Sequence, residues 1–193
     1  MNNPVWIDDK GKIVEPEYCR DFLSRHPMRC INDRFYTVDG QLPDENKLKR
    51  TIYEELSLWL HAKAAQTVEQ VIKALKLAAY ADPLPLQCDR IHVANGTYFL
   101  DGTFTEEKEY CSNRLPVSYQ TEAPAPEQWL RFLSELLEPE DIPALQEYLG
   151  YCLIPSTKGQ KMLMLIGKGG EGKSRIGVVM NAIFGLNMNT TSI

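Results

Sequence analysis

The sequence predicts an α+β fold over residues 1–155, followed by the first strand, loop and helix of an incomplete α/β P-loop domain over residues 156–193. The first part rests on short runs that alternate apolar and polar residues and on longer runs with helical spacing. The second part rests on a glycine-rich loop that stands between an apolar run and an amphipathic segment. A chain of 193 residues has room for both parts.

Composition indicates a folded protein in a reducing compartment. Hydrophobic residues make up 44% of the chain and charged residues 24%, the balance of a globular protein. The five cysteines lie far apart, without the close pairs of zinc sites, and no apolar run approaches the ~20 residues of a membrane span. We therefore expect reduced thiols, a cytoplasmic location and no membrane partner.

Charge is spread unevenly along the chain. Residues 155–193 hold five basic side chains and one acidic one, so their net charge is +4. The whole chain has a net charge of −5, so residues 1–154 carry −9. This asymmetry favours an anionic partner near the C-terminal end.

Residues 1–43 are expected to form a helix and a hairpin. Pro16 in EPEYCRDFLSRH suits the first turn of a helix. The stretch MRCINDRFYTVDG predicts two short strands about Asn32 and Asp33, closed by Asp39 and Gly40.

From Asp44 the apolar spacing becomes helical. A second helix is predicted to begin at TVEQ, where Thr67 as N-cap and Gln70 form a capping box. The positions expected to face the core are Leu48, Ile52, Leu56, Trp59 and Leu60 in the first helix, and Val68, Val71, Ile72 and Leu75 in the second.

The next stretch, IHVANGTYFLDG, predicts a hairpin that turns at Asn95 and Gly96. TEAPAPEQ reads as a stiff linker, and two short helices follow it. Their expected core positions are Trp129, Phe132, Leu133 and Leu136, then Ile142, Leu145, Leu149 and Cys152.

The segment GKGGEGKS, from Gly167 to Ser174, fits the phosphate-binding pattern G-x-x-x-x-G-K-[ST]. KMLMLIG before it suits a strand buried on both faces, and KSRIGVVMNAIF after it has apolar residues at helical spacing. The glycines let backbone N–H groups approach phosphate oxygens, Lys173 reaches the β- and γ-phosphates, and the Ser174 hydroxyl is a ligand for Mg²⁺. The expected binding residues are Gly167, Lys168, Gly169, Gly170, Glu171, Gly172, Lys173 and Ser174.

Hydrolysis needs more groups than this loop supplies. An acidic residue on another strand holds the Mg²⁺, a polar group positions water, and an arginine often comes from a neighbouring subunit. Only IGVVMNAIFGLNMNTTSI follows the loop. We therefore assign no catalytic residue and expect this chain alone not to turn over ATP at a useful rate.

Several stretches together resemble a known family: HPMRCINDRFYTVDG, IHVANGTYFLDG, LPVSYQTEAPAPEQWLRFLSEL, LQEYLGYCLIP and GKGGEGKS. They are similar to the primase-helicase proteins of phages, plasmids and integrated elements, and more distantly to the poxvirus replicative nucleoside triphosphatase. The similarity runs from about residue 18 to the end. By this resemblance residues 1–155 correspond to a collar or linker domain, and residues 156–193 to the start of the motor.

The resemblance implies a superfamily 3 helicase, a ring of usually six subunits that hydrolyses ATP and moves along one DNA strand. It implies ATP and Mg²⁺ as cofactors, single-stranded or forked DNA as partner, a homo-oligomeric ring, and a primase on the same or a companion chain. Gly167, Gly169, Gly172, Lys173 and Ser174 match the family's loop, whereas Glu171 stands where the family commonly has Asn. The chain resembles a motor truncated shortly after this motif, since the acidic strand, sensor and arginine finger would follow Ile193.

A rival hypothesis is a non-catalytic oligomerisation or DNA-docking module whose loop is vestigial. Asp8 and Asp9 could suggest a metal-binding pair, but a solvated turn is the preferred interpretation. The histidines His26, His61 and His92 are interpreted as surface or hydrogen-bonded core residues. Residues 46–50, NKLKR, favour a charged helix face over a DNA contact.

Overall fold

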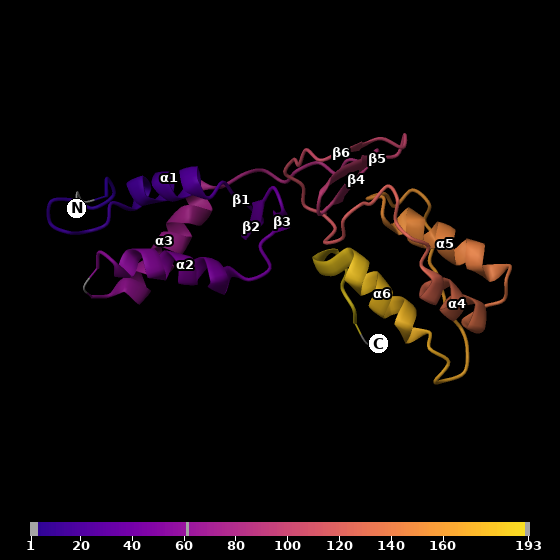
Figure 1. Ribbon diagram of the computed structural model, residues 1–193. Coiled ribbons are helices and arrows are strands. Elements are labelled where there is room, and N and C mark those ends of the chain that lie inside the picture. The colour runs from indigo at the N-terminus through magenta and orange to yellow at the C-terminus, as the bar shows by residue number, and fades with distance from the viewer. Residues whose placement is uncertain (1–3, 61, 192–193) are drawn as a thin grey trace. The chain divides into compact units, whose positions relative to one another are not determined.

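The computed structural model describes residues 4–60 and 62–191, and the chain divides into two compact units at Leu84 and Pro85 (Figure 1). The units do not coincide with the domains expected from the sequence, whose boundary near residue 155 stays a prediction. Within the described ranges, no helix is long and apolar enough to cross a membrane.

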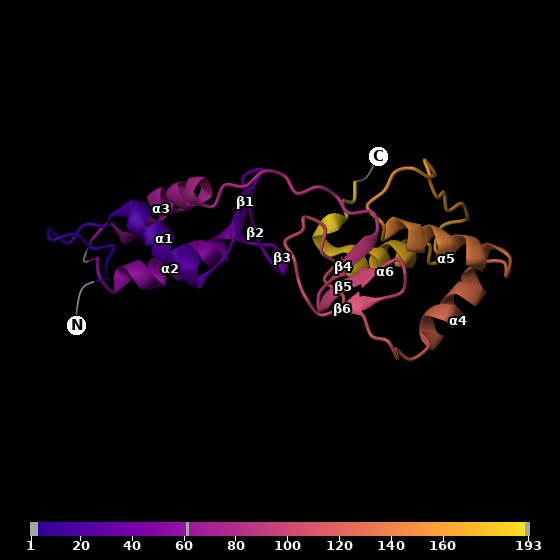
Figure 2. The same cartoon turned by 90° about the horizontal axis from the view of Figure 1, so that it is seen from above.

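The first unit is built around three helices, α1 (Glu15–Arg25), α2 (Glu45–Ser57) and α3 (Ala64–Ala78), which the two views in Figures 1 and 2 show lying together. Pro16 occupies the first turn of α1, and the Asp44 side chain caps α2 by accepting from the Asn46 N–H at 2.8 Å. The predicted apolar faces are confirmed as the core, except that α2 ends at Ser57, so Trp59 and Leu60 lie beyond the helix and are only partly buried against that core. Its most buried members are Tyr18, Phe22, Ile52, Leu56, Val71 and Leu75.

The predicted start of α3 is wrong. The observed N-cap is Lys63, four residues before the predicted Thr67, and it has a left-handed conformation with φ 60°; the helix itself begins at Ala64. Thr67 is inside the first turn, where its hydroxyl donates to the Lys63 carbonyl at 3.1 Å instead of capping. Two alanines and a glutamine, all good helix formers, carry the helix back past the capping-box pattern.

The first sheet is antiparallel, in the order β1 (Arg29–Ile31), β2 (Arg34–Thr37), β3 (Gly40–Gln41). The predicted turn is confirmed at Asn32 and Asp33, with φ 49° and 64°, values that Asn and Asp tolerate better than most residues. The end of α3 joins this sheet, because the Cys30 N–H donates to the Ala79 carbonyl at 2.7 Å.

The second unit holds the other predicted hairpin, β4 (Arg90–Val93) and β5 (Gly96–Phe99), with a short third strand β6 (Phe104–Thr105). The two connecting residues are Ala94 and Asn95, one position earlier than expected, since Val93 pairs with Gly96. The shift leaves the Asn95 side chain free to bond outside the hairpin.

Three further helices, α4 (Glu127–Leu136), α5 (Asp141–Cys152) and α6 (Ser174–Phe184), share a small apolar core, and the short 3-10 helix η1 (Gly185–Asn187) follows α6. One fully buried residue comes from each helix: Leu133, Leu145 and Ile176. The expected core faces of α4 and α5 pack here, except for Cys152, which lines a neighbouring cavity instead.

The strand predicted at residues 161–166 does not form. This stretch has no regular structure, and Met162 and Ile166 are 80% and 85% exposed; Leu163 packs against the small core. A strand needs backbone partners on a neighbouring strand, and none lies beside these described residues. The fold class observed is α+β, with two small antiparallel sheets and six α-helices in the described ranges.

We expect Ile52→Ala to lower the free energy of unfolding of the first unit by about 2 to 5 kcal/mol, because it leaves a cavity at a residue with 0% exposure. Urea unfolding followed by circular dichroism would measure it. Tyr53→Ala, at the neighbouring 46% exposed position, is the control and should cost less than about 1 kcal/mol. Equal losses in the two variants would contradict the packing of α2.

Candidate functional site

The predicted phosphate-binding residues form an exposed loop, 167–173, that leads into α6. Gly170 and Gly172 have φ values of 89° and 99°, which residues with a Cβ rarely adopt. A Cβ at Gly172 would also stand 3.2 Å from the ring of Phe132. Both positions therefore need glycine for local reasons, whatever the loop binds.

Lys173 folds back over the loop. Its ammonium donates to the Lys168 carbonyl at 2.6 Å and to Glu171 Oε2 at 2.9 Å. The hydrogen bond from Lys173 lowers the pKa of the Glu171 carboxyl. A Cβ at Gly167 would clash with this carboxylate and lie 2.8 Å from Lys173 Nζ, so the first glycine lies directly against the pair.

Ser174 is the first residue of α6, and its side chain is exposed. The N–H groups of Arg175 and Ile176 donate to the carbonyls of Gly172 and Lys173, at 2.8 and 3.1 Å. Ile176, 1% exposed, anchors the helix start in the small core. The positive end of the helix dipole is thereby aimed at the loop.

The structure thus places the predicted phosphate-binding residues in one loop, and the Lys173 ammonium lies over that loop. Within residues 4–60 and 62–191, no three His, Cys, Asp or Glu side chains cluster as a metal site. The assignment of Ser174 as a Mg²⁺ ligand stays a prediction.

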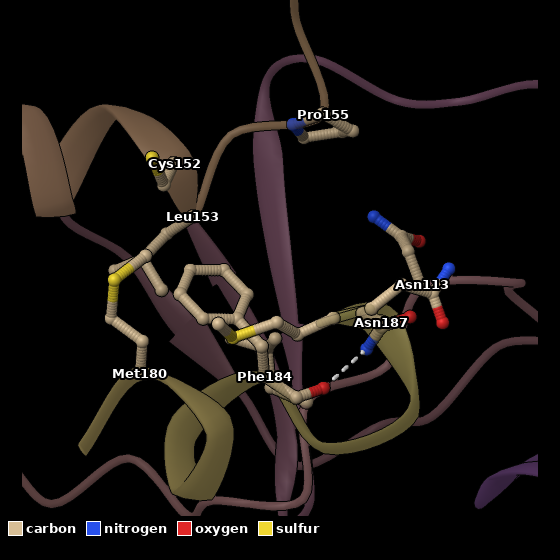
Figure 3. A pocket seen from close by; sticks show the side chains of 10 residues that line it. Asn113, Cys152, Leu153, Pro155, Met180, Phe184 and Asn187 are labelled. Carbon is tan, nitrogen blue, oxygen red and sulfur yellow. Dashed lines mark hydrogen bonds between the residues drawn. The ribbon is translucent and has the colours of Figure 1, made fainter. Parts of the chain in front are cut away.

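A separate cavity of about 400 Å³ lies at the other end of α6 (Figure 3). It is lined mostly by apolar side chains, among them Leu153, Met180 and Phe184. Asn187 closes one side, where its amide donates to the carbonyls of Phe184 and Arg114 at 3.1 and 2.9 Å. This cavity contains no ionisable group apart from the Cys152 thiol.

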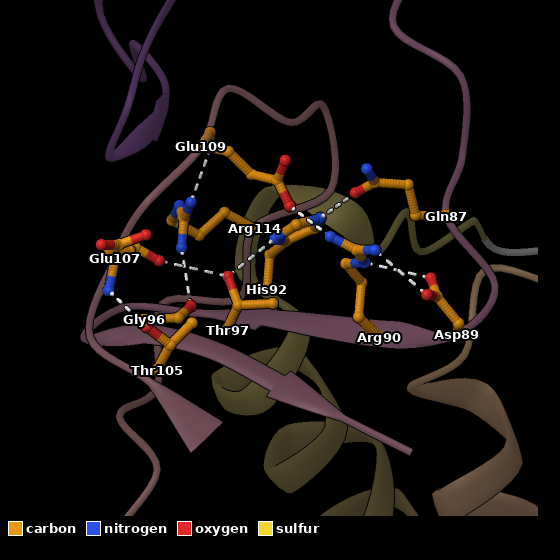
Figure 4. Close-up of polar contacts among 10 residues, drawn as sticks. All are labelled: Gln87, Asp89, Arg90, His92, Gly96, Thr97, Thr105, Glu107, Glu109 and Arg114. Carbon is orange, nitrogen blue, oxygen red and sulfur yellow. Dashed lines mark hydrogen bonds and ion pairs between the residues drawn. The ribbon is translucent and has the colours of Figure 1, made fainter. Parts of the chain in front are cut away.

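The most connected polar group of the second unit surrounds the β4–β5 hairpin (Figure 4). Arg114, 8% exposed, donates to the carbonyls of Val93, Gly96 and Glu109 at 2.6, 3.0 and 2.8 Å. Its Nε atom has no hydrogen-bond partner among the described atoms. A guanidinium therefore closes the hairpin by binding backbone oxygens.

His92 is the buried histidine of this network, at 2% exposure. Its Nε2 lies 2.9 Å from Gln87 Oε1, and its Nδ1 lies 3.3 Å from the hydroxyl of Thr97. Burial, and then the charge of Arg114, lowers the pKa of His92. The interpretation of His92 as a hydrogen-bonded core residue is confirmed.

The residues NGTY, 95–98, each have a structural task. Asn95 exchanges two hydrogen bonds with the backbone of Tyr119, at 2.8 and 2.9 Å. A side chain at Gly96 would clash with the backbone of Thr105. Thr97 is 1% exposed beside His92, and the ring of Tyr98 contacts that of Tyr119 with 4.9 Å between centroids.

Sequence reasoning missed Arg114 and the partners of His92. Arg114 stands in an irregular stretch, CSNRLP, whose letters carry no periodic pattern. NGTY predicted the hairpin, but it gave no indication of the residues that hydrogen-bond to the hairpin. The other minor interpretations hold: Asp8 accepts turn hydrogen bonds from Lys10 and Lys12, and His26 is exposed on α1. His61 lies outside the described residues.

The charged face over residues 46–50 is also confirmed. The Lys49 ammonium lies 3.0 Å from Glu69 and 3.5 Å from Glu45, and Arg50 pairs with Glu54 at 2.8 Å.

Comparison with known families places the chain. The family model described as D5 N terminal like matches residues 19–138, more than half of the chain. The chain therefore belongs to this family, the N-terminal domains of D5-like primase-helicase proteins of phages and viruses. The resemblance seen in the sequence is confirmed to this extent. A search of curated proteins found no match.

We expect the second unit to lose stability as the pH falls below about 6.5, because the unfolded chain takes up a proton at His92 that the folded chain resists. The direction follows from the lowered pKa. Neutral His92 contributes its full share of the free energy of unfolding when the pH is above the pKa of the unfolded chain. That share is lost as the pH falls toward the lower pKa of the folded chain. Its slope is at most about 1.4 kcal/mol per pH unit. Urea unfolding at pH 7.5 and 5.5, followed through Trp129 with Trp6 and Trp59 replaced by Phe, would measure it.

His92→Gln should reduce this pH dependence, whereas His26→Gln, at the exposed residue that follows α1, is the matched control. Equal slopes in the parent chain and His92→Gln would show that the buried ring is not the group responsible.

Proposed function

We propose that this chain is part of an ATP-dependent DNA helicase that replicates a phage, prophage or plasmid, and that it binds the ATP phosphates through Gly167–Ser174. Two observations support the proposal: membership of the D5 N terminal like family, and the geometry of the loop. In this proposal single-stranded or forked DNA is the partner, the complete protein forms a homo-oligomeric ring, and a primase acts with it.

The position of Lys173 is the observation that carries the ATP assignment. Its ammonium is held over the loop by Lys168 O and Glu171, both anionic or partly negative oxygens. Phosphate oxygens present the same kind of acceptor, so a bound nucleotide would exchange one set of oxygens for another without moving the cation far. The dipole of α6 and the N–H groups of the glycine turn would add further attraction.

Glu171 opposes this binding, because its carboxylate already occupies Lys173 and carries a negative charge beside the expected phosphates. It is the one loop position where the chain departs from the pattern of the primase-helicases it resembles. Bound ATP must therefore displace the Glu171–Lys173 pair, which is exposed enough to be weak.

A second candidate function is a non-catalytic oligomerisation or DNA-docking module with a vestigial loop. One observation favours it: residues 161–166 form no strand, so the loop stands without the sheet that supports such loops in working motors. ATP turnover by this chain would favour the first function over the second, since only the first includes it.

We expect Lys173→Ala to abolish binding of Mg·ATP by the 193-residue chain, measured by isothermal titration calorimetry. The reason is that Lys173 is the cation placed over the glycine turn. Lys158→Ala, an exposed lysine outside the loop, is the control and should bind as the parent does. Unchanged binding by Lys173→Ala would exclude the loop as the site.

Glu171→Asn should tighten Mg·ATP binding about three- to tenfold, because it removes one negative charge close to the phosphates and frees Lys173. The gain should shrink as salt is raised, since screening weakens the repulsion that the variant removes. A loss of affinity in Glu171→Asn would mean that the carboxylate supports the site, for instance through the metal ion.

A further inference from the structure

A groove with a volume of about 1030 Å³ opens beside the loop, between α4 and the first turns of α6. Most of the residues that line it are apolar, and it reaches the loop at Gly172. The residues that line it are Pro124, Ala125, Pro126, Glu127, Gln128, Trp129, Phe132, Gly172, Arg175, Val178 and Val179.

Two aromatic rings form a strip along this groove. Trp129 and Phe132 stack with 5.5 Å between centroids and 28° between planes. The ring of Phe132 lies 3.2 Å from where a Cβ of Gly172 would be, so the strip begins at the loop itself. Trp129 lies one helical turn away on α4, so the aromatic surface extends outward from the loop.

The facing wall, on α6, offers an apolar side chain and a cation. Val178 is 58% exposed, and the Arg175 side chain makes no ion pair or hydrogen bond with any described residue. Arg175 follows Ser174 directly and lines the groove, so the groove has a basic residue next to the loop in the chain. Glu127 and Gln128, at the start of α4, supply hydrogen-bonding groups at the rim.

We propose that this groove binds the base and ribose of the nucleotide, a purine stacked on the indole of Trp129, while the loop holds the phosphates. The inference rests on the proposed function of the loop. A nucleotide joins a flat aromatic base to its phosphates through one sugar, and here an aromatic surface adjoins a glycine turn at a shared residue, Gly172. A purine covers more of the Trp129 indole than a pyrimidine does, and Arg175, which lines the groove, is assigned to the ribose or the first phosphate.

An apolar peptide is the other occupant that such a groove could take. The base is favoured because the groove opens onto the loop and carries a cation at that end, which a peptide would not require. A peptide in the groove would also leave binding of nucleotide and of inorganic tripolyphosphate equal.

The experiment compares Mg·ATP with Mg·tripolyphosphate, which has the phosphates but no base, by calorimetry on the 193-residue chain. We expect the parent chain to bind ATP about 5- to 100-fold more tightly, the range that stacking of one base provides. Trp129→Ala should lose this advantage and still bind tripolyphosphate as the parent does. Trp129→Phe should restore part of it, and Leu130→Ala, on the same helix outside the groove, should change nothing.

The outcomes separate the inference from the proposed function. Equal affinity for ATP and tripolyphosphate in the parent would overturn the base site, while the assignment of the loop as the phosphate site would be retained. A preference for ATP that survives in Trp129→Ala would place the base elsewhere. Binding of neither compound would remove both the loop assignment and the base site. Retained tripolyphosphate binding shows that each variant is folded at the loop.

Discussion

The second unit depends on hydrogen bonds from one buried side chain, Arg114, that join an irregular stretch of chain to the β4–β5 hairpin. Residues 106–126 contain no helix or strand, yet part of this stretch lies buried against the hairpin. Arg114 donates to three carbonyls, on β4, on β5 and at Glu109, while its own carbonyl accepts from Asn187 after α6. An unpaired buried carbonyl costs about 1 to 3 kcal/mol, and Arg114 supplies donors that tie the irregular stretch at Glu109 to the paired strands β4 and β5.

The same logic explains the residues that relate this chain to its family. NGTY looks like a turn motif, but its side chains act on the segment that follows the hairpin. The Asn95 amide exchanges two hydrogen bonds with the backbone of Tyr119, as a paired strand residue would. Gly96 has no side chain, which lets the backbone of Thr105 lie close to it. The family model covers this region and stops at residue 138, before the loop. Within the matched region, the side chains of NGTY therefore have packing and hydrogen-bonding roles.

The loop and the family region nevertheless meet in one unit. Ile176 of α6 is buried with Leu133 and Leu145, and Phe132 touches Gly172. The helix that belongs to the family match thus forms one side of the proposed nucleotide site. A change in the packing of α4 would therefore alter the loop, because Phe132 of α4 contacts Gly172 directly.

Much of the fold was determined by the sequence alone. Core faces such as Ile52 and Leu56 follow from spacing, both hairpins follow from short turn signals, and the glycine loop before α6 follows from a fixed pattern, because each depends on neighbours in the chain. The tertiary structure decided the rest. It moved the start of α3 to Ala64, left residues 161–166 without strand partners, and buried His92 and Arg114 in one network. These outcomes depend on which distant groups come within hydrogen-bond or packing distance, and no local pattern of residues records that.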